Sequence, residues 1–408
     1  MNIALVGVAA IIGIAVLFSE NRRAIRPRTV GAAFALQAAL AVFALYVPFG
    51  RTVLEAMANG VQNVVDYAND GIEFLFGGIV SGELGFIFAF NVLPVIVFVS
   101  ALIAALYYLR IMQWIVVILG GGLRRVIGAS QVESLCSAAN VFVGMIEAPL
   151  VVRPYLATLT RPQLFTVMAV GLSSVSGAIL IGYASLGIDL TYLLPAAFMA
   201  APGGLLMAKL LVPDTPGEEK PETEALNIEA FDPEDRPANV IEAAADGAAS
   251  GLKIAVGVGA MLLAFVALLS LLNGIFAAVG DLFGVEGMTL EYLLGQLFAP
   301  LMFLLGVPWS EAAVAGNLLG QKIILNEFIA FVTLADIKDT LSPHTQAVVT
   351  FALCGFANLS ALAIVFGGLG GMVPDRKHEI ARMGLKAVLA GTLSNLMSAA
   401  LASVLLSL

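Results

Sequence analysis

The sequence predicts an all-α polytopic membrane protein with eight transmembrane helices, two opposed re-entrant helical hairpins related as inverted repeats, and interfacial helices. Of its 408 residues, 60% are hydrophobic and 12% are charged, whereas soluble domains carry about 25% charged residues. Apolar stretches long enough to cross about 30 Å of hydrocarbon recur from one end to the other. Two further apolar stretches are interrupted by polar residues and cannot cross twice. This composition excludes an ordinary soluble enzyme.

Eight apolar stretches have the length of a membrane span. They are residues 3–19, 30–48, 86–109, 163–182, 190–211, 252–273, 344–366 and 384–406. The interrupted stretches, about 127–157 and 302–332, contain Gly, Pro, Asn and Glu and predict re-entrant hairpins. Leu54–Tyr67 mixes apolar and polar residues at helical spacing, which predicts an amphipathic helix in the membrane interface, and 276–296 predicts a second one.

The net charge of −9 comes from one segment of the chain. Residues 214–246 contain eleven acids and two bases, together with several prolines. A segment this polar cannot cross lipid and reads as a solvated linker. Residues 213–250 are therefore predicted to form an acidic cytoplasmic loop, and the rest of the chain is electrically balanced.

The positions of Lys and Arg predict the orientation of the chain. Basic residues follow the first and third spans and precede the eighth, which places those loops in the cytoplasm. Only Arg51, Lys322 and Lys338 then fall on the outer side, and both termini face outward. We expect a multi-pass protein of the bacterial inner (plasma) membrane. The two cysteines, Cys136 and Cys354, lie in apolar stretches and suggest no disulfide framework.

The two hairpin segments resemble each other. Gly128 precedes Glu133 by five residues, and Gly306 precedes Glu311 by the same spacing. A second acid follows in each segment, and each segment leads into a span with a polar break, at residues 173–177 and 354–360. In the predicted topology one hairpin enters from the cytoplasm and the other from outside. Inverted repeats of this kind are typical of transporters, with the binding site near the midplane.

The second acids of the hairpins, Glu147 and Glu327, are the candidate functional residues. A carboxylate inside hydrocarbon costs roughly 2.5–3.5 kcal/mol even on the mildest insertion scales. The pair could bind a cation, share a proton, accept hydrogen bonds from a polyol, or cap the hairpin tips, and spacing alone does not choose. An intramembrane enzyme could use them as acid and base, but no His or Lys cluster accompanies them, so we expect a transporter and not an enzyme.

Four neutral side chains could supply oxygen ligands to a monovalent cation. They are Asn140, Ser173, Ser174 and Ser176. Sodium accepts such a set. The alternative for serines in membrane helices is a hydrogen bond back to their own helix or close helix packing.

Several motifs resemble those of one known family. Residues 140–155, from Asn140 through Gly144-Met-Ile-Glu147 to Tyr155, resemble the signature hairpin of concentrative nucleoside transporters. Residues 326–328, 354–360 and 391–397 resemble its other signatures, and the likeness covers essentially the whole chain. The resemblance implies a homotrimer in the lipid bilayer that imports a nucleoside with a coupling ion by an elevator-type movement. It implies no other cofactor and no nucleic acid partner.

The resemblance also implies roles for individual residues. The nucleoside would be bound by Gly144, Met145, Ile146, Glu147, Ile179, Glu327, Phe356, Asn358 and Ala361. Sodium would be bound by the side chains of Asn140 and Ser174 and the carbonyls of Val143 and Val175. Proton-coupled bacterial relatives lack the asparagine, so its presence favours sodium.

Three positions depart from the family pattern. Met145 and Ile146 stand where the family has Gln and Thr, and Ala361 stands where it has a serine. Losing these polar groups predicts an atypical base site that favours purine nucleosides. The alternative is a proton-coupled symporter of the same fold for a modified nucleoside or another ribose-like solute.

The resemblance implies a division into two domains. Residues 1–110 and 251–300 are expected to form mainly scaffold, and 111–212 and 301–408 are expected to form the two repeats of a transport domain.

Overall fold

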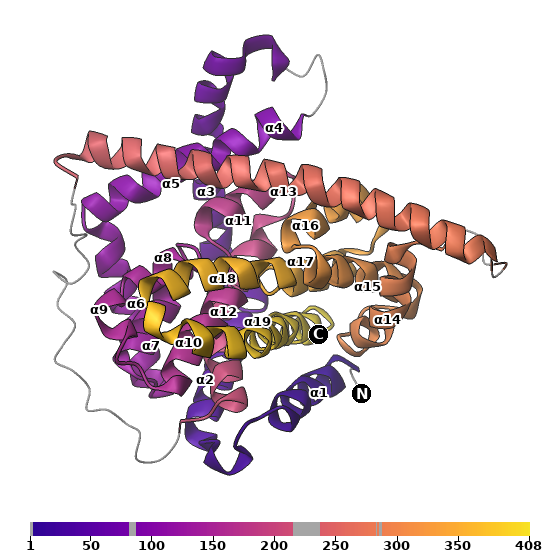
Figure 1. Cartoon of the computed structure of the whole chain (residues 1–408), viewed down its shortest axis with the longest axis horizontal. Coiled ribbons are helices and arrows are strands. Elements are labelled where there is room, and N and C mark those ends of the chain that lie inside the picture. The colour runs from indigo at the N-terminus through magenta and orange to yellow at the C-terminus, as the bar shows by residue number, and fades with distance from the viewer. Residues whose placement is uncertain (1–2, 81–86, 215–236, 283, 285–287) are drawn as a thin grey trace.

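The computed structural model describes residues 3–80, 87–214, 237–282, 284 and 288–408, and every regular element in them is helical (Figure 1). The helices are α1 (Ile3–Leu17), η1 (Arg22–Ala24), α2 (Pro27–Leu45), α3 (Pro48–Phe76), η2 (Gly77–Ile79), α4 (Phe88–Asn91), α5 (Leu93–Tyr108), α6 (Ile111–Ile127), α7 (Gln131–Ala139), α8 (Glu147–Leu150), α9 (Arg153–Leu156), α10 (Arg161–Ser173), α11 (Gly177–Ser185), α12 (Leu190–Leu211), α13 (Val240–Leu282), α14 (Leu290–Leu304), α15 (Trp309–Ile324), α16 (Glu327–Ile337), η4 (Lys338–Thr340), α17 (Pro343–Leu353), α18 (Leu359–Met372), η5 (Pro374–Arg376) and α19 (Lys377–Leu406).

Six of the eight predicted spans coincide with described helices, or nearly continuous helical stretches, that are long and apolar enough to cross a membrane. The span predicted at 190–211 is α12 to the residue. The other two predicted spans are shorter in the structure. The first is α1, with 15 residues, and the seventh is divided into α17 and α18 at the polar break.

The longest helix is α13, which crosses the whole molecule in Figure 1 and packs along α5. The Asn239 side chain caps its first turn by accepting from the backbone N–H groups of Ile241 and Glu242. Small residues then allow close contact, since a methyl group on Gly247 would lie 2.7 Å from the carbonyl oxygen of Ser100. The predicted loop at 213–250 is therefore wrong at its end, which is helical, while 215–236 lies outside the described residues.

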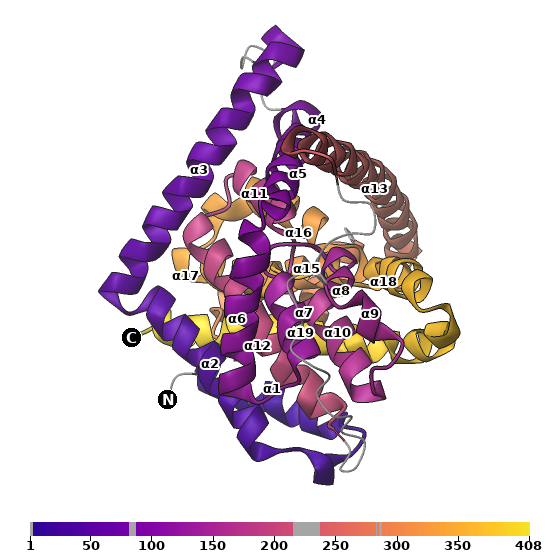
Figure 2. The same ribbon diagram turned by 90° about the vertical axis from the view of Figure 1, so that its left-hand side faces the viewer.

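Of the two predicted interfacial helices, the structure contains the first and not the second. The first is present and longer than predicted, because α3 runs for 29 residues from Pro48 at its first turn to a C-cap glycine, Gly77, with φ of +52°. It stands apart from the core on one side of the molecule (Figure 2). The second, at 276–296, is wrong as a single helix. α13 ends at Leu282, and α14 begins after the Thr289 side chain accepts from the N–H of Tyr292.

The core consists of two broken helices and the long helices that follow them in the chain. α10 packs against α12 and α19, and α17 packs against α19. Within the α10–α11 span 89% of the residues in its apolar window are buried, and within α12 83% are buried. Figure 2 shows α12 and α19 at the centre of the molecule. The same order of elements, a hairpin, a broken helix and a long helix, thus occurs twice.

Helices α1 and α2 also pack on this core, against α19 and α12. Glu20, in the loop between them, forms ion pairs of 2.8 Å with Arg161 and Lys386. Although partial burial acts to raise it, these two cations hold the pKa of Glu20 below its ordinary value. Gln37 of α2 is fully buried and donates from Nε2 to the Oγ of Ser398 at 2.9 Å. The first two helices are therefore anchored to α10 and α19 by polar contacts.

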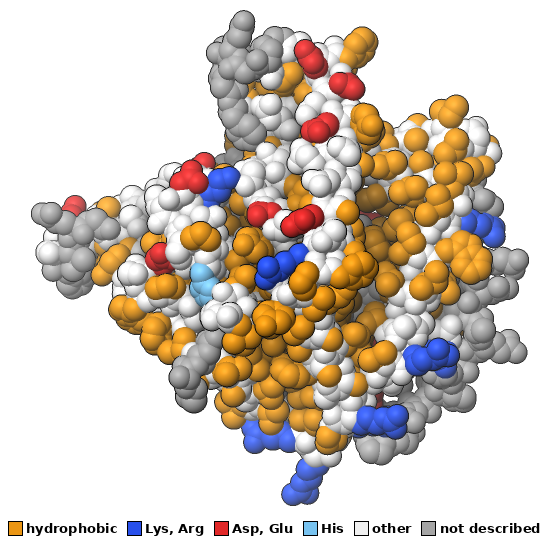
Figure 3. All heavy atoms as spheres, turned by 180° about the vertical axis from the view of Figure 1, so that it is seen from behind, with side chains coloured by type: hydrophobic (Ala, Val, Ile, Leu, Met, Phe, Trp, Pro, Cys, Tyr) orange, Lys and Arg blue, Asp and Glu red, His pale blue; other side chains and the backbone are white. Residues whose placement is uncertain are grey.

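The surface has the character of a membrane protein. Seen from behind, hydrophobic side chains cover much of the face, several Lys and Arg groups lie along its lower edge, and most Asp and Glu groups lie in its upper half (Figure 3). Both cysteines are free and buried, as expected for thiols that only pack.

The base of the first hairpin is fixed by a buried ion pair. Ser130 and Glu133 form a capping box at the start of α7, so the carboxylate caps the helix. The same carboxylate accepts from Nζ of Lys209 at 2.7 Å, and Lys209 also pairs with Asp214 at 2.6 Å. Lys209 therefore ties the C-terminal end of α12 to the hairpin.

Lys209→Met should destabilise the protein strongly, because it leaves the Glu133 carboxylate buried without its cation. Breaking a buried pair in this way costs about 3–5 kcal/mol. The melting temperature can be measured in detergent with a thiol-reactive dye, since Cys136 and Cys354 are exposed only on unfolding. Lys253→Met on the exposed face of α13 is the control. Equal melting temperatures for the two variants would contradict the assignment.

Candidate functional site

The candidate site is built from helix ends that meet inside the core. In the first repeat α7 ends at Ala139 and α10 ends at Ser173. The hydroxyl of Ser174 donates to the Asn140 carbonyl at 2.9 Å, and the N–H of Gly177 donates to the Phe142 carbonyl at 2.9 Å. The interruption of the hairpin therefore lies directly against the interruption of the span.

Asn140 has an acceptor without a donor. Its Nδ2 donates to the Cys136 carbonyl at 3.0 Å, while its Oδ1 is buried and accepts no hydrogen bond from the described residues. Buried polar groups are normally satisfied. The four residues expected to bind sodium are all buried here: Asn140, Val143, Ser174 and Val175. Two C-terminal helix ends also carry partial negative charge, so the donor set fits a monovalent cation.

Glu327 lies in the second repeat, at the start of the second limb of its hairpin. It is the first residue of α16 and is 5% exposed. Its Oε2 accepts from Nδ2 of Asn358 at 2.7 Å, and its Oε1 accepts from the hydroxyl of Tyr183 at 3.2 Å. Asn358 in turn caps α18, since its Oδ1 accepts from the N–H of Ala361 at 2.7 Å. The carboxylate therefore joins three helix segments, two of them at their N-termini.

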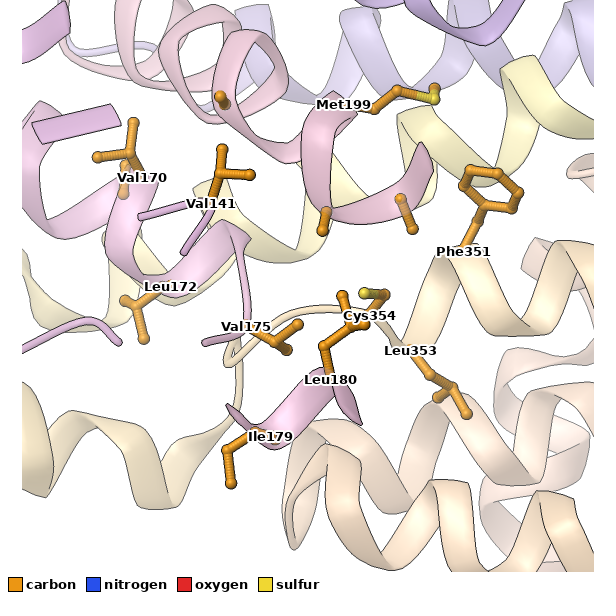
Figure 4. Close-up of a cluster of buried hydrophobic side chains, with 14 of the residues drawn as sticks. Val141, Val170, Leu172, Val175, Ile179, Leu180, Met199, Phe351, Leu353 and Cys354 are labelled. Carbon is orange, nitrogen blue, oxygen red and sulfur yellow. The ribbon is translucent and has the colours of Figure 1, made fainter. Parts of the chain in front are cut away.

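The two repeats meet through their breaks. The N–H of Phe356 donates to the Ser174 carbonyl at 3.1 Å, which joins the ion-binding candidates to the second broken helix. Around this contact Val175 and Leu180 point towards Cys354 in one apolar cluster, and Ile179 points away from it (Figure 4). Phe356 itself is half-buried beside the break.

At the tip of the first hairpin, one side chain is exposed and two apolar side chains pack on neighbouring helices. Glu147 is exposed, and its carboxylate lies over Gly144, where a methyl group would be 2.5 Å from Oε2. Met145 packs on α10, because a methyl group on Gly171 would lie 3.2 Å from its Cβ. Ile146 packs on α18, because a methyl group on Gly368 would lie 2.9 Å from its Cγ2. Apolar contacts thus hold the tip while the carboxylate remains accessible.

The hydroxyl of Tyr107 on α5 interacts electrostatically with Glu147. That hydroxyl is buried and has no hydrogen-bond partner among the described residues. The two glutamates therefore have different surroundings. Glu327 is buried with two donors, and Glu147 is exposed.

Sequence reasoning missed several residues around Glu327. Tyr183 gave no signal, because a tyrosine in an apolar span is common. Lys322 was predicted only to lie on the outer side of the membrane, and the structure shows that its side chain is fully buried. The signal that could have found it is the one that found Glu327, an ionisable residue inside an apolar segment. Asn395 was noticed only within a motif.

Comparison with known proteins covers nearly the whole chain. Residues 192–403 match the family model described as Na+ dependent nucleoside transporter C-terminus, and residues 6–79 match the corresponding N-terminus model. Residues 89–189 match a model described as nucleoside recognition. The nucleoside permease NupC of Helicobacter pylori is 47% identical over 414 residues, with 99% of this chain and 97% of NupC covered.

Two solved structures have the same fold. CNTnw in an inward-facing substrate-bound state is 49% identical, with a TM-score of 0.94, over 99% of this chain and 97% of that chain. A variant of CNTnw in an outward-facing state is 48% identical, with a TM-score of 0.94 and the same coverage.

Proposed function

Because the chain belongs to the Na+-dependent nucleoside transporter family, we propose that it imports nucleosides across the bacterial inner membrane by symport with sodium. The observation that carries the proposal is the buried Glu327 carboxylate with Asn358 and Tyr183 as its donors. A carboxylate held by neutral donors can exchange them for two ribose hydroxyls without losing its charge. The nucleoside is released chemically unchanged.

The nucleoside would lie between the two hairpins. On the second repeat, Glu327 accepts hydrogen bonds from the ribose hydroxyls and Asn358 donates to them. Phe356 and Ala361 lie beside these two residues. On the first repeat, Glu147 reaches the base and ribose from the tip formed by Gly144, Met145 and Ile146, and Ile179 completes the apolar wall. Support comes from the hydrogen bond between Asn358 and Glu327 and from the accessibility of Glu147.

Sodium would bind at Asn140, Val143, Ser174 and Val175, where the orphaned Oδ1 of Asn140 supplies the clearest support. The ion would hold the two helix ends together. Because the Ser174 carbonyl is bonded to the N–H of Phe356, ordering this break also positions the nucleoside side of the site. Coupling between two ligands is reciprocal, so bound nucleoside should strengthen sodium binding equally.

Alternating access would follow an elevator-type movement of a transport domain past a scaffold. Both inward-facing and outward-facing structures of CNTnw resemble this chain with equal TM-scores. We assign α3, α5 and α13 to the scaffold of a homotrimer, and the hairpins and broken helices to the two repeats of the transport domain, which have inverted topology. Residues 1–110 and 251–300 remain mainly scaffold in this proposal, although α1 and α2 pack on the core. Both termini would face outward.

The test is uptake into proteoliposomes that contain the purified protein. Uptake of radiolabelled purine and pyrimidine nucleosides is measured under three conditions. The first has an inward sodium gradient, the second has choline in place of sodium and an inward proton gradient, and the third has no ion gradient. Uptake that requires sodium supports the proposal. Equal uptake with choline and a proton gradient alone would overturn sodium coupling and favour the proton-coupled alternative.

The first hairpin tip should determine the choice of base. Replacing Gln and Thr of the family pattern by Met145 and Ile146 removes hydrogen bonds, each of which costs about 1–3 kcal/mol when a buried partner is left unpaired. We propose that the site prefers purine nucleosides, read by packing against these two side chains.

Met145→Gln with Ile146→Thr should therefore raise uridine uptake relative to adenosine by roughly tenfold or more. Threonine keeps the branched Cγ2 that packs on Gly368, so the tip should still fold. Met145→Leu with Ile146→Val is the control, because it changes shape without adding polar atoms. Equal uridine uptake by the wild type and the polar double variant would contradict this base site.

A further inference from the structure

Lys322 is a fully buried lysine in the last turn of α15. Its Nζ donates to the Ala352 carbonyl at 2.7 Å and to Oδ1 of Asn395 at 2.7 Å. Among the residues that the structure describes, no carboxylate lies within 4.0 Å of this nitrogen. An ammonium without an ion-pair partner is costly inside a protein. Its position therefore requires an explanation beyond packing.

One acceptor of Lys322 lies at a helix end, and the other, in the interior of α19, itself donates to the carbonyls of helix ends. Ala352 is in the last turn of α17, and Asn395 donates from Nδ2 to the Cys354 carbonyl at 2.9 Å and the Ser173 carbonyl at 2.6 Å. These carbonyls terminate the first halves of the two broken helices. The C-terminal end of a helix carries partial negative charge and favours a cation. α15 also ends close by, because Lys322 lies in its last turn, and the ammonium contacts the end of α17 through the Ala352 carbonyl.

The first repeat has the same arrangement without a lysine. There α7 and α10 end together at Asn140 and Ser174, the place proposed above for sodium. In each repeat the first limb of the hairpin and the first half of the broken helix thus converge on one cationic position. In the first repeat the cation would be a free ion, and in the second it is attached to the chain and is bound by an amide oxygen of α19.

We propose that the ammonium of Lys322 is the tethered cation of the second repeat, occupying the counterpart of the sodium site, so that only one sodium ion is coupled to each nucleoside. This inference rests on the proposed sodium symport. Lys322 acts as a positioning residue, because it fixes the α17 end and attracts the Glu327 carboxylate electrostatically. It does not touch the nucleoside itself.

Asn395 connects the tethered cation to the sodium site. It holds Lys322 through Oδ1 and the Ser173 carbonyl through Nδ2, and Ser174 follows directly in the chain. The contact leaves no room for a side chain at Gly355, where a methyl group would lie within van der Waals overlap of Asn395 Oδ1 and 2.6 Å from the Ser173 carbonyl oxygen. The two cationic positions are therefore linked by one amide.

The first measurement uses the wild-type protein in proteoliposomes. The reversal potential of nucleoside flux at set sodium and nucleoside gradients gives the number of sodium ions per nucleoside. One ion is expected. Two ions would overturn the tethered cation and leave sodium symport intact. A flux that ignores the sodium gradient would overturn the proposed function itself and this inference with it.

The second measurement compares Lys322→Met with Lys338→Met. Lys338 also donates to a carbonyl, that of Gly187, but it is exposed at the end of the hairpin. With the ammonium removed, a second sodium ion is expected to enter, so the Hill coefficient for sodium should rise from about one towards about two while half-saturating sodium rises roughly tenfold. Lys338→Met should match the wild type. A folded Lys322→Met transporter with unchanged sodium activation would overturn the proposal. If that variant does not fold, the number of sodium ions per nucleoside in the wild type tests the proposal instead.

Discussion

Glu327→Gln should reduce nucleoside affinity by at least about 100-fold and abolish measurable uptake. A hydrogen bond to a charged group contributes about 1.5–3 kcal/mol, and in the proposed site the carboxylate receives two ribose hydroxyls. About 1.4 kcal/mol corresponds to a factor of ten. The amide also presents an N–H towards Asn358 or Tyr183, which are donors at 2.7 and 3.2 Å. Equilibrium binding of a radiolabelled nucleoside to the purified protein, together with uptake, measures the loss.

The matched control is Glu311→Gln in the same hairpin. Glu311 lies near the hairpin base, where it accepts from the N–H and hydroxyl of Ser342 at 3.2 and 2.8 Å. Its loss should lower the melting temperature modestly and leave affinity within about threefold of the wild type. If Glu327→Gln folds and binds nucleoside as tightly as Glu311→Gln does, Glu327 is not a substrate ligand.

Local sequence patterns predicted the helix breaks well, because a break needs residues that satisfy free backbone groups. The polar runs at 173–177 and 354–360 are the breaks in the structure, with Ser176 and Asn358 as N-caps of the following helices. Helix lengths were predicted less well. α13 extends well beyond its apolar window because small residues facing α5 continue the packing, and this depends on a partner far away in the sequence.

The ends of the second hairpin were also predicted less well than the helix breaks. The second hairpin was predicted from 302, but α14 runs to Leu304, and the turn at Gly306, with φ of +94°, precedes α15. A continuous apolar run does not reveal where a helix stops and the next begins at a sharp angle. The pair α14 and α15 is bent by 116°, an angle that packing determines.

Some site residues could be identified from the sequence, and others only from the structure. The intramembrane cost of a carboxylate identified Glu327, and its contact with Asn358 agrees with the role that the family resemblance implies. The same cost argument applied to Lys322 would have found the second buried charge. By contrast, the unsatisfied Oδ1 of Asn140 arises only because a neighbouring break excludes other donors. An unsatisfied buried acceptor depends on the three-dimensional arrangement of the chain and cannot be predicted from the sequence.

Ser174→Ala should raise the sodium concentration for half-maximal uptake by roughly tenfold or more, because an oxygen ligand to a charged ion contributes about 1.5–3 kcal/mol. The hydroxyl already donates to the Asn140 carbonyl at 2.9 Å, which leaves its lone pairs available to an ion. Sodium activation curves in proteoliposomes measure the shift, and the maximal rate at saturating sodium should recover.

Ser173→Ala is the closest control that the chain offers. Ser173 is adjacent, equally buried, and donates to the Ala169 carbonyl at 2.6 Å in its own helix. Its loss removes the same atom from the same break without removing an ion ligand, so sodium activation should stay within about twofold of the wild type. Equal shifts in both variants would mean that the serines act only through the shape of the break, and the ion site would have to lie elsewhere.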